Sequence, residues 1–221
     1  MIRHMIKSTL VLLMLISSSA FANNPISSQT KTTKMTDHDS KWNLIFGGQL
    51  GYGVLSTENI AGFSRKDGNL YGGIFIGLDY HLIKKMSVGI EYGNNYGYDL
   101  LEFDSNCCSN TVKMKHTVTV PLLLTLKYWT SFGLNFFAKG GAAYVHQADD
   151  ASGPDDGTVN LSKDALKTAL AGGIGYQIDR WNFFIQYMYI FGDENAVVEY
   201  NKSSSLPVQS ITGGVSYMLP L

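Results

Sequence analysis

An alternation of apolar and polar residues, repeated in eight segments, constrains this chain more than any other feature. From Trp42 onward, large apolar side chains recur at every second position, and mostly Gly, Ser, Thr, Asn and Gln lie between them. A period of two is typical of a β-strand with one apolar face. The eight segments are residues 42–54, 70–82, 87–98, 113–128, 134–144, 166–178, 181–192 and 210–219.

The segments are too long for an ordinary soluble sheet. Most of them span roughly 10–14 residues, whereas soluble strands usually have about 5–6. A strand tilted by about 45° needs about 9–11 residues to cross a bilayer. The small and polar residues of the second face do not pack a dry core, so the apolar face must point outward to lipid. We predict an all-β fold: an eight-stranded antiparallel up-and-down transmembrane β-barrel over residues 41–221.

The connections between the segments alternate in length. The long ones are residues 55–69, 99–111, 147–164 and 193–206, and the short ones are residues 83–86, 129–133 and 179–180. Outer-membrane barrels join short periplasmic turns to long outer loops. We therefore expect the short turns and both ends of the barrel chain on the periplasmic side.

Aromatic residues gather at the two ends of the segments, as expected for the aromatic girdles of a membrane barrel. The expected outer girdle contains Tyr52, Tyr96, Tyr98, Tyr144, Tyr189 and Phe191. The expected periplasmic girdle contains Trp42, Tyr80, Tyr128, Trp129, Tyr176, Trp181 and Tyr217.

The amino terminus has the features of a secretory signal peptide. A basic start precedes an unbroken apolar run at residues 10–16, and an Ala-Phe-Ala sequence ends at Ala22. We expect a signal peptide over residues 1–22 that is cleaved after Ala22, and a flexible periplasmic leader over residues 23–40. With the lipid-facing strands, this predicts a location in a Gram-negative outer membrane.

The composition excludes several other classes of protein. Apolar residues make up 45% of the 221 residues and charged residues 16%, which is too apolar for an intrinsically disordered chain. The 17 Lys and Arg residues do not outnumber the 18 Asp and Glu residues, so we expect no nucleic-acid partner. Two cysteines cannot make a disulfide-dense scaffold.

The last segment carries a more specific pattern. Thr212, Gly214, Tyr217 and Leu219 place a polar residue, a glycine, an aromatic and a hydrophobic residue at fixed spacing. With the eight segments, this pattern resembles the small eight-stranded outer-membrane β-barrel family, which includes the opacity-type surface proteins and the transmembrane domain of outer-membrane protein A. The resemblance covers about residues 42–221. It implies that these four residues form a carboxy-terminal signal for the barrel-assembly machinery, and that the barrel contacts outer-membrane lipid, including lipopolysaccharide.

Four charged residues fall on the inward face of neighbouring strands, all in the periplasmic half. They are Asp79, Glu91, Lys127 and Lys139. Unpaired charges in a narrow lumen are costly, so we expect ion pairs, such as Glu91 with Lys139 or with Lys127. This lumen charge network is interpreted as a plug that fills the interior, and the alternative is a gated polar path.

Other polar residues give weaker indications. Adjacent Cys107 and Cys108 lie in an outer loop, where we expect an oxidised pair, within one chain or between chains. The acidic stretch at residues 149–157 is interpreted as a solvated loop rather than a cation site. His81, His116 and His146 have no Ser and acid partners beside them at matched depth, so we expect interface histidines. We expect no metal, no cofactor and no catalytic residues.

We therefore predict a non-enzymatic surface protein that supports envelope integrity or presents loops for adhesion or as an antigen, with a host or surface ligand as partner. One alternative is a porin-like narrow channel for small or apolar solutes. A less favoured alternative is a lipid-modifying barrel enzyme.

Overall fold

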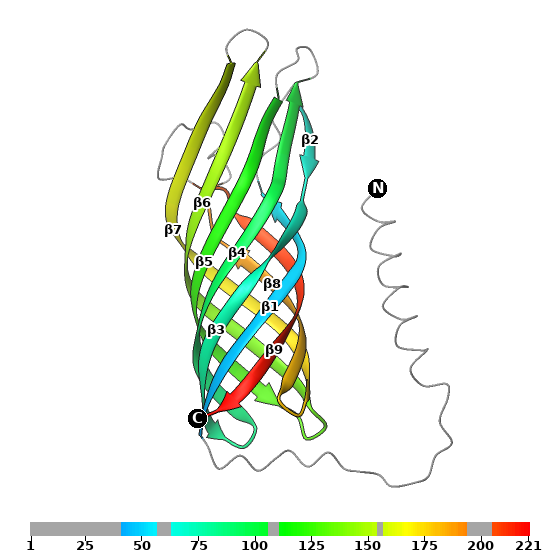
Figure 1. Ribbon diagram of the computed structural model, residues 1–221, viewed down its shortest axis with the longest axis vertical. Helices are drawn as coiled ribbons and strands as arrows, with labels where there is room; N and C mark the ends of the chain where they lie inside the picture. The colour runs from blue at the N-terminus through cyan, green and yellow to red at the C-terminus, as the bar shows by residue number, and fades with distance from the viewer. Residues whose placement is uncertain (1–40, 57–62, 106–110, 154–156, 194–204) are drawn as a thin grey trace, which may run out of the picture. The chain divides into compact units, whose positions relative to one another are not determined.

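A computed structural model describes residues 41–56, 63–105, 111–153, 157–193 and 205–221 (Figure 1). Within these residues the chain forms only strands and their connections. The strands are β1 (Trp42–Leu55), β2 (Phe63–Asp67), β3 (Asn69–Ile83), β4 (Met86–Ser105), β5 (Thr111–Trp129), β6 (Leu134–Gly153), β7 (Gly157–Ile178), β8 (Trp181–Ile190) and β9 (Val208–Pro220). No helix among the described residues is long and apolar enough to cross a membrane.

The strands close into one antiparallel ring. Their order is β2-β4-β3-β1-β9-β8-β7-β6-β5, and a further pairing of β4 with β5 closes the sheet. β2 and β3 both pair with β4 and are separated only by Gly68, whose φ of 78° breaks the strand. They therefore form one wall, and the ring has eight walls. This confirms the predicted eight-stranded up-and-down antiparallel barrel.

The alternation also predicts correctly which side chains face outward. Outward residues of the central strands remain largely exposed, such as Ile74 at 71% and Leu124 at 69%. Their neighbours in sequence are buried, such as Phe75 and Leu123. One apolar surface thus covers the outside of the barrel, as the sequence predicts.

The short turns lie where the sequence predicts them, but three of the predicted long connections are partly strand. Within residues 55–69, which were predicted as a loop, residues 63–67 form β2 and Asn69 begins β3. β4 continues to Ser105, and β6 and β7 remain paired as far as Gly153 and Gly157. Residues 99–105 and most of residues 147–164 were therefore wrongly predicted as loops. Beyond the lipid a strand needs no apolar face, because pairing with its neighbour still satisfies the backbone polar groups. Hydrophobic alternation therefore marks only the membrane-facing part of each strand.

The interior is more apolar than predicted. One apolar cluster, which we call the phenyl layer, consists of Ile45, Phe75, Phe137 and Phe184. A second, the loop-end cluster, gathers Leu55, Tyr71, Leu100, Leu101, Leu123, Ala143, Val145, Ala169, Ala171, Met188, Ile190, Leu206 and Val208. The prediction that the inward face packs no dry core is therefore wrong at these two levels. Polar side chains occupy the interior between these two clusters.

Candidate functional site in the barrel interior and at its rims

The structure brings the four predicted lumen charges together as two ion pairs. Lys127 Nζ lies 2.6 Å from Asp79 Oδ2, and Lys139 Nζ lies 2.7 Å from Glu91 Oε1. Each pair spans an intervening strand: Asp79 on β3 reaches β5, and Glu91 on β4 reaches β6. Gly89 of β4 makes the first crossing possible, because a Cβ there would lie 2.2 Å from Asp79 Oδ1.

The two carboxylates differ in their other partners. Asp79 also accepts hydrogen bonds from the hydroxyls of Thr125, at 3.3 Å, and Ser87, at 3.4 Å. Glu91 accepts its hydrogen bond from Lys139. The Lys139 side chain is 4% exposed, against 13% for Lys127. Lys139 is therefore the more enclosed of the two lysines, whereas Asp79, at 2%, is more enclosed than Glu91, at 11%.

Lys139 also lies against the phenyl layer. Its Nζ is 5.3 Å from the ring centroid of Phe75, 5.1 Å from that of Phe137 and 5.9 Å from that of Phe184. Each distance is within the range of a cation–π contact. These rings were not predicted from the sequence, although strand parity, the alternation of inward and outward side chains along a strand, indicates them. Phe137 lies two residues before inward Lys139, and Phe75 lies between outward residues.

A belt of polar side chains crosses the interior above the phenyl layer. Gln49 of β1 donates to Asn95 of β4 at 2.8 Å, and Gln49 Oε1 accepts from Gln186 at 3.3 Å and Thr212 at 3.2 Å. The buried hydroxyl of Tyr71 lies 2.5 Å from that of Thr119. Three of these bonds each bridge two strands that have one strand between them: β1 and β4, β1 and β8, and β3 and β5. They therefore tie the barrel together across its interior at this level.

The loop-end cluster fills the interior beyond the polar belt. A β-bulge between Tyr98 and Leu101, with Asp99 at a φ of 47°, turns both Leu100 and Leu101 inward. Gln147 holds a connecting segment inside as well. Its amide donates to the Leu206 carbonyl at 3.2 Å, and its Oε1 accepts from the Leu206 N–H at 3.0 Å. The described interior is thus filled by side chains at successive levels.

Most of the predicted periplasmic girdle faces outward at the short-turn end. Trp42 packs on Tyr80 with ring centroids 4.8 Å apart, Trp181 packs on Tyr217 at 4.9 Å, and Tyr128 and Tyr176 are similarly exposed. Trp129 does not belong to this girdle. It is 3% exposed and packs inside on the ring of His81, at 5.2 Å. Residues two apart on a strand face the same side, so Trp129 faces inward like Lys127.

The outer surface near the loop end carries a polar cluster that sequence analysis missed. Asp164 Oδ1 accepts a hydrogen bond from the Tyr144 hydroxyl at 2.6 Å and lies 2.7 Å from His146 Nδ1. Hydrogen bonds from Tyr144 and His146 hold the pKa of Asp164 below its usual range. The expectation that no acid lies beside His146 is therefore wrong. Asp164 was placed in a loop, whereas β7 extends to it and pairs it with His146. On the neighbouring strands, Nδ1 of His116 on β5 contacts the hydroxyl of Tyr96 on β4.

The remaining predicted residues lie either on β9 or outside the described residues. Thr212 and Gly214 of the carboxy-terminal pattern face inward, and Tyr217 and Leu219 lie on the outward face of β9. Cys107 and Cys108 lie outside the described residues, as do the signal peptide, the leader and the centre of the acidic loop. The described residues contain no group of three or more His, Cys, Asp or Glu that could hold a metal ion.

This chain resembles known proteins in structure but not in sequence. No protein-family profile and no curated protein sequence matches the chain. The crystal structure of Ail, the attachment invasion locus protein of Yersinia pestis, superposes with a TM-score of 0.50 at 11% identity, over 81% of this chain and 99% of Ail. Neisserial surface protein A gives 0.43 at 10% identity, over 79% and 96%. The outer-membrane protein OprG of Pseudomonas aeruginosa gives 0.43 at 12%, over 82% and 98%. The closed ring, the outward apolar surface and the superposition on Ail together show that this chain has the fold of the small eight-stranded outer-membrane β-barrels.

Proposed function

We propose that the protein is a non-enzymatic outer-membrane surface protein that presents its loop end to the exterior. There it supports envelope integrity or binds a host or surface ligand. One observation carries this proposal: the interior is filled, while the walls β4 to β7 continue well beyond the outward apolar band. Figure 1 shows these walls rising at the loop end.

The length of β6 gives the scale of this extension. β6 has 20 residues, which at about 3.3 Å each and a tilt of about 40° rise about 50 Å. The outward apolar band of such barrels is about 25 Å tall. On β6 the apolar alternation ends at Tyr144, so about nine residues, or roughly 23 Å, remain beyond the band. A paired wall of that height is suited to hold loops away from the membrane surface.

The membrane location is part of the same proposal. It is supported by the signal-peptide features of residues 1–22, by the outward aromatic residues at both ends, and by the carboxy-terminal pattern. We expect cleavage after Ala22. In this proposal the barrel-assembly machinery reads that pattern during insertion, and lipid, including lipopolysaccharide, surrounds the barrel.

A narrow channel is the competing function, and the filled interior argues against it. Eight strands leave an interior just wide enough for side chains to fill. We expect planar-bilayer recordings of the purified barrel to show no large, stable conductance. A stable open level in the wild-type protein would favour the channel instead.

Shortening the loop end tests the surface role. Residues 148–162 are replaced by a two-residue turn, and separate variants shorten residues 57–62 and 194–204. We expect each barrel to assemble, as judged by heat-sensitive migration on gels, while binding of intact cells to host matrix or resistance to detergent is lost. An interior variant that keeps all loops, Lys127→Met, serves as the control. If cells carrying a barrel that combines all three changes keep both phenotypes, the surface role is wrong.

A further inference from the structure

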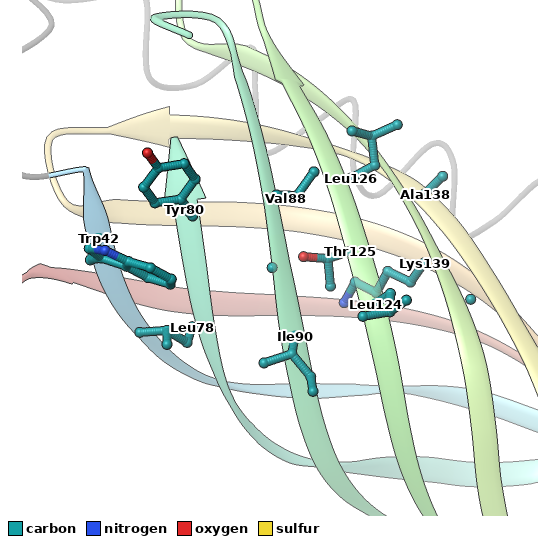
Figure 2. A pocket seen from close by; sticks show the side chains of 12 residues that line it. Trp42, Leu78, Tyr80, Val88, Ile90, Leu124, Thr125, Leu126, Ala138 and Lys139 are labelled. Carbon is teal, nitrogen blue, oxygen red and sulfur yellow. The ribbon is translucent and has the colours of Figure 1, made fainter. Parts of the chain in front are cut away.

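The outer wall of the barrel is hollowed at its short-turn end. A groove of about 750 Å³ crosses β3 to β6 and is lined by Leu78, Tyr80, Val88, Ile90, Leu124 and Leu126 (Figure 2). At one edge of the groove β6 presents only Ala138 and Gly140, and at the other edge lies the Trp42–Tyr80 ring pair of β1 and β3. The outward residues of β4 and β5 lie between these two edges (Figure 2). The lining side chains that face outward are almost entirely apolar.

Positive charge is concentrated at the rim of this groove. Lys84 and Lys85 form the turn between β3 and β4, and both are exposed. These two strands supply four of the six lining residues named above. Lys41 is exposed as well, and its carbonyl accepts the N–H of His81 on β3 at 2.8 Å, which fixes it beside the same turn. The turn between β7 and β8 instead carries Asp179 and Arg180, whose charges cancel.

An apolar groove beneath a basic, aromatic rim matches the chemistry of one kind of molecule. An acyl chain fits the groove, tryptophan and tyrosine rings lie at the level of the lipid headgroups, and lysines attract a phosphate. We propose that this groove is a binding site for an anionic glycerophospholipid, with its chain against Ala138 and its phosphate at Lys84 and Lys85. The site rests on the membrane location proposed above. Each lysine near an anionic surface contributes about fivefold in affinity.

Trp42 lies at the groove, so quenching of its fluorescence reports which lipid occupies the groove. A Trp129→Phe/Trp181→Phe variant leaves Trp42 as the sole tryptophan, and a Trp42→Phe/Trp129→Phe variant leaves Trp181, on β8, as the matched control. Both are reconstituted in phosphatidylcholine vesicles with 10% of a lipid with brominated chains, either phosphatidylglycerol or phosphatidylcholine. We expect the brominated phosphatidylglycerol to quench Trp42 several-fold more than the brominated phosphatidylcholine, and to quench Trp181 equally with both.

Further variants test separately the contribution of the headgroup contacts and that of the groove. Lys84→Gln/Lys85→Gln should abolish the difference at Trp42, and Ala138→Leu should reduce it by filling the groove. Ala142→Leu, outward on the same strand but outside the groove lining, should leave it unchanged. Equal quenching of Trp42 by the two brominated lipids overturns the site. A preference that Ala138→Leu leaves unchanged also overturns it. So does cross-linking of two barrels through Ala138→Cys in a Cys107→Ser/Cys108→Ser background, which would make a second copy the occupant. If neither tryptophan is quenched by either lipid, the barrel is outside the bilayer and the proposed membrane location fails instead.

Discussion

Replacing Lys139 by methionine tests whether the interior charges stabilise the barrel as enclosed pairs. Methionine keeps the length of the side chain and removes its charge. The change leaves the Glu91 carboxylate, whose side chain is 11% exposed, without the ammonium group 2.7 Å away. Removing one partner of a buried pair costs about 3–5 kcal/mol, because the other charge remains buried and uncompensated. The lost cation–π contacts with the three phenyl rings add about 0.5–2 kcal/mol.

Two companion variants isolate the reason for this loss. Lys127→Met should cost less, about 2 kcal/mol, because Asp79 keeps the hydroxyl donors of Thr125 and Ser87. The double variant Glu91→Leu/Lys139→Met removes both charges, and we expect it to lie within about 1.5 kcal/mol of the wild type. The double variant should thus be more stable than Lys139→Met alone.

The assay is equilibrium unfolding by guanidinium in phospholipid vesicles, followed by tryptophan fluorescence and by migration on gels without heating. The free energies of unfolding of the wild type, Lys139→Met, Glu91→Leu and the double variant give the coupling between Lys139 and Glu91. We expect a coupling of at least about 2 kcal/mol. A coupling below about 0.5 kcal/mol would refute the reasoning, as would a double variant no more stable than Lys139→Met.

Three further predictions follow from other contacts. A Cβ at Gly214 would lie 2.4 Å from a phenyl carbon inside the barrel, whereas one at Gly213 meets nothing nearer than 3.9 Å outside. Gly214→Ala should therefore lower the free energy of unfolding by about 1–3 kcal/mol and Gly213→Ala should leave it nearly unchanged in the same assay. Tyr71→Phe removes a buried hydroxyl and should cost about 1 kcal/mol, and an unchanged unfolding midpoint would contradict this. The lowered pKa of Asp164 contributes stability above the ordinary aspartate pKa of about 3.9, and that stability is lost as the pH falls through the lower folded-state value. Tyr144→Phe should therefore raise the pKa of Asp164 in a carboxyl NMR titration, and no change would exclude the hydrogen bond as its main cause.

Strand parity predicts the facing of residues that lie within the lipid. It predicts the outward apolar surface, and applied without exception it also turns Trp129 and Phe137 inward. Parity says nothing about which strand a side chain reaches across the lumen. The pair of Glu91 with Lys139 was among the expected alternatives, whereas Asp79 with Lys127 was not. Their contact depends on the stagger between walls and on the missing side chain at Gly89.

The loop end was the least predictable part of the barrel from sequence. The bulge at Asp99 shifts parity by one residue, so two consecutive leucines point inward, which a period of two cannot describe. Asp164 lies beside His146 only because β6 and β7 remain paired where no apolar alternation marks them. In both places backbone pairing determines the contacts, and the side chains carry no periodic signal of it.

The seam between β1 and β9 has a consequence for how freely the loops can vary. It joins Asn43 to Pro220 and Leu55 to Val208, so the ring closes only when the two ends of the barrel chain meet. The chain entropy lost in closing a loop grows with the logarithm of its length, and doubling a loop adds only about 0.6 kcal/mol. Insertions between paired walls therefore change the closure entropy very little. Natural sequences of this barrel should tolerate large differences in loop length, provided that the residues of the seam and the glycines facing the lumen are kept.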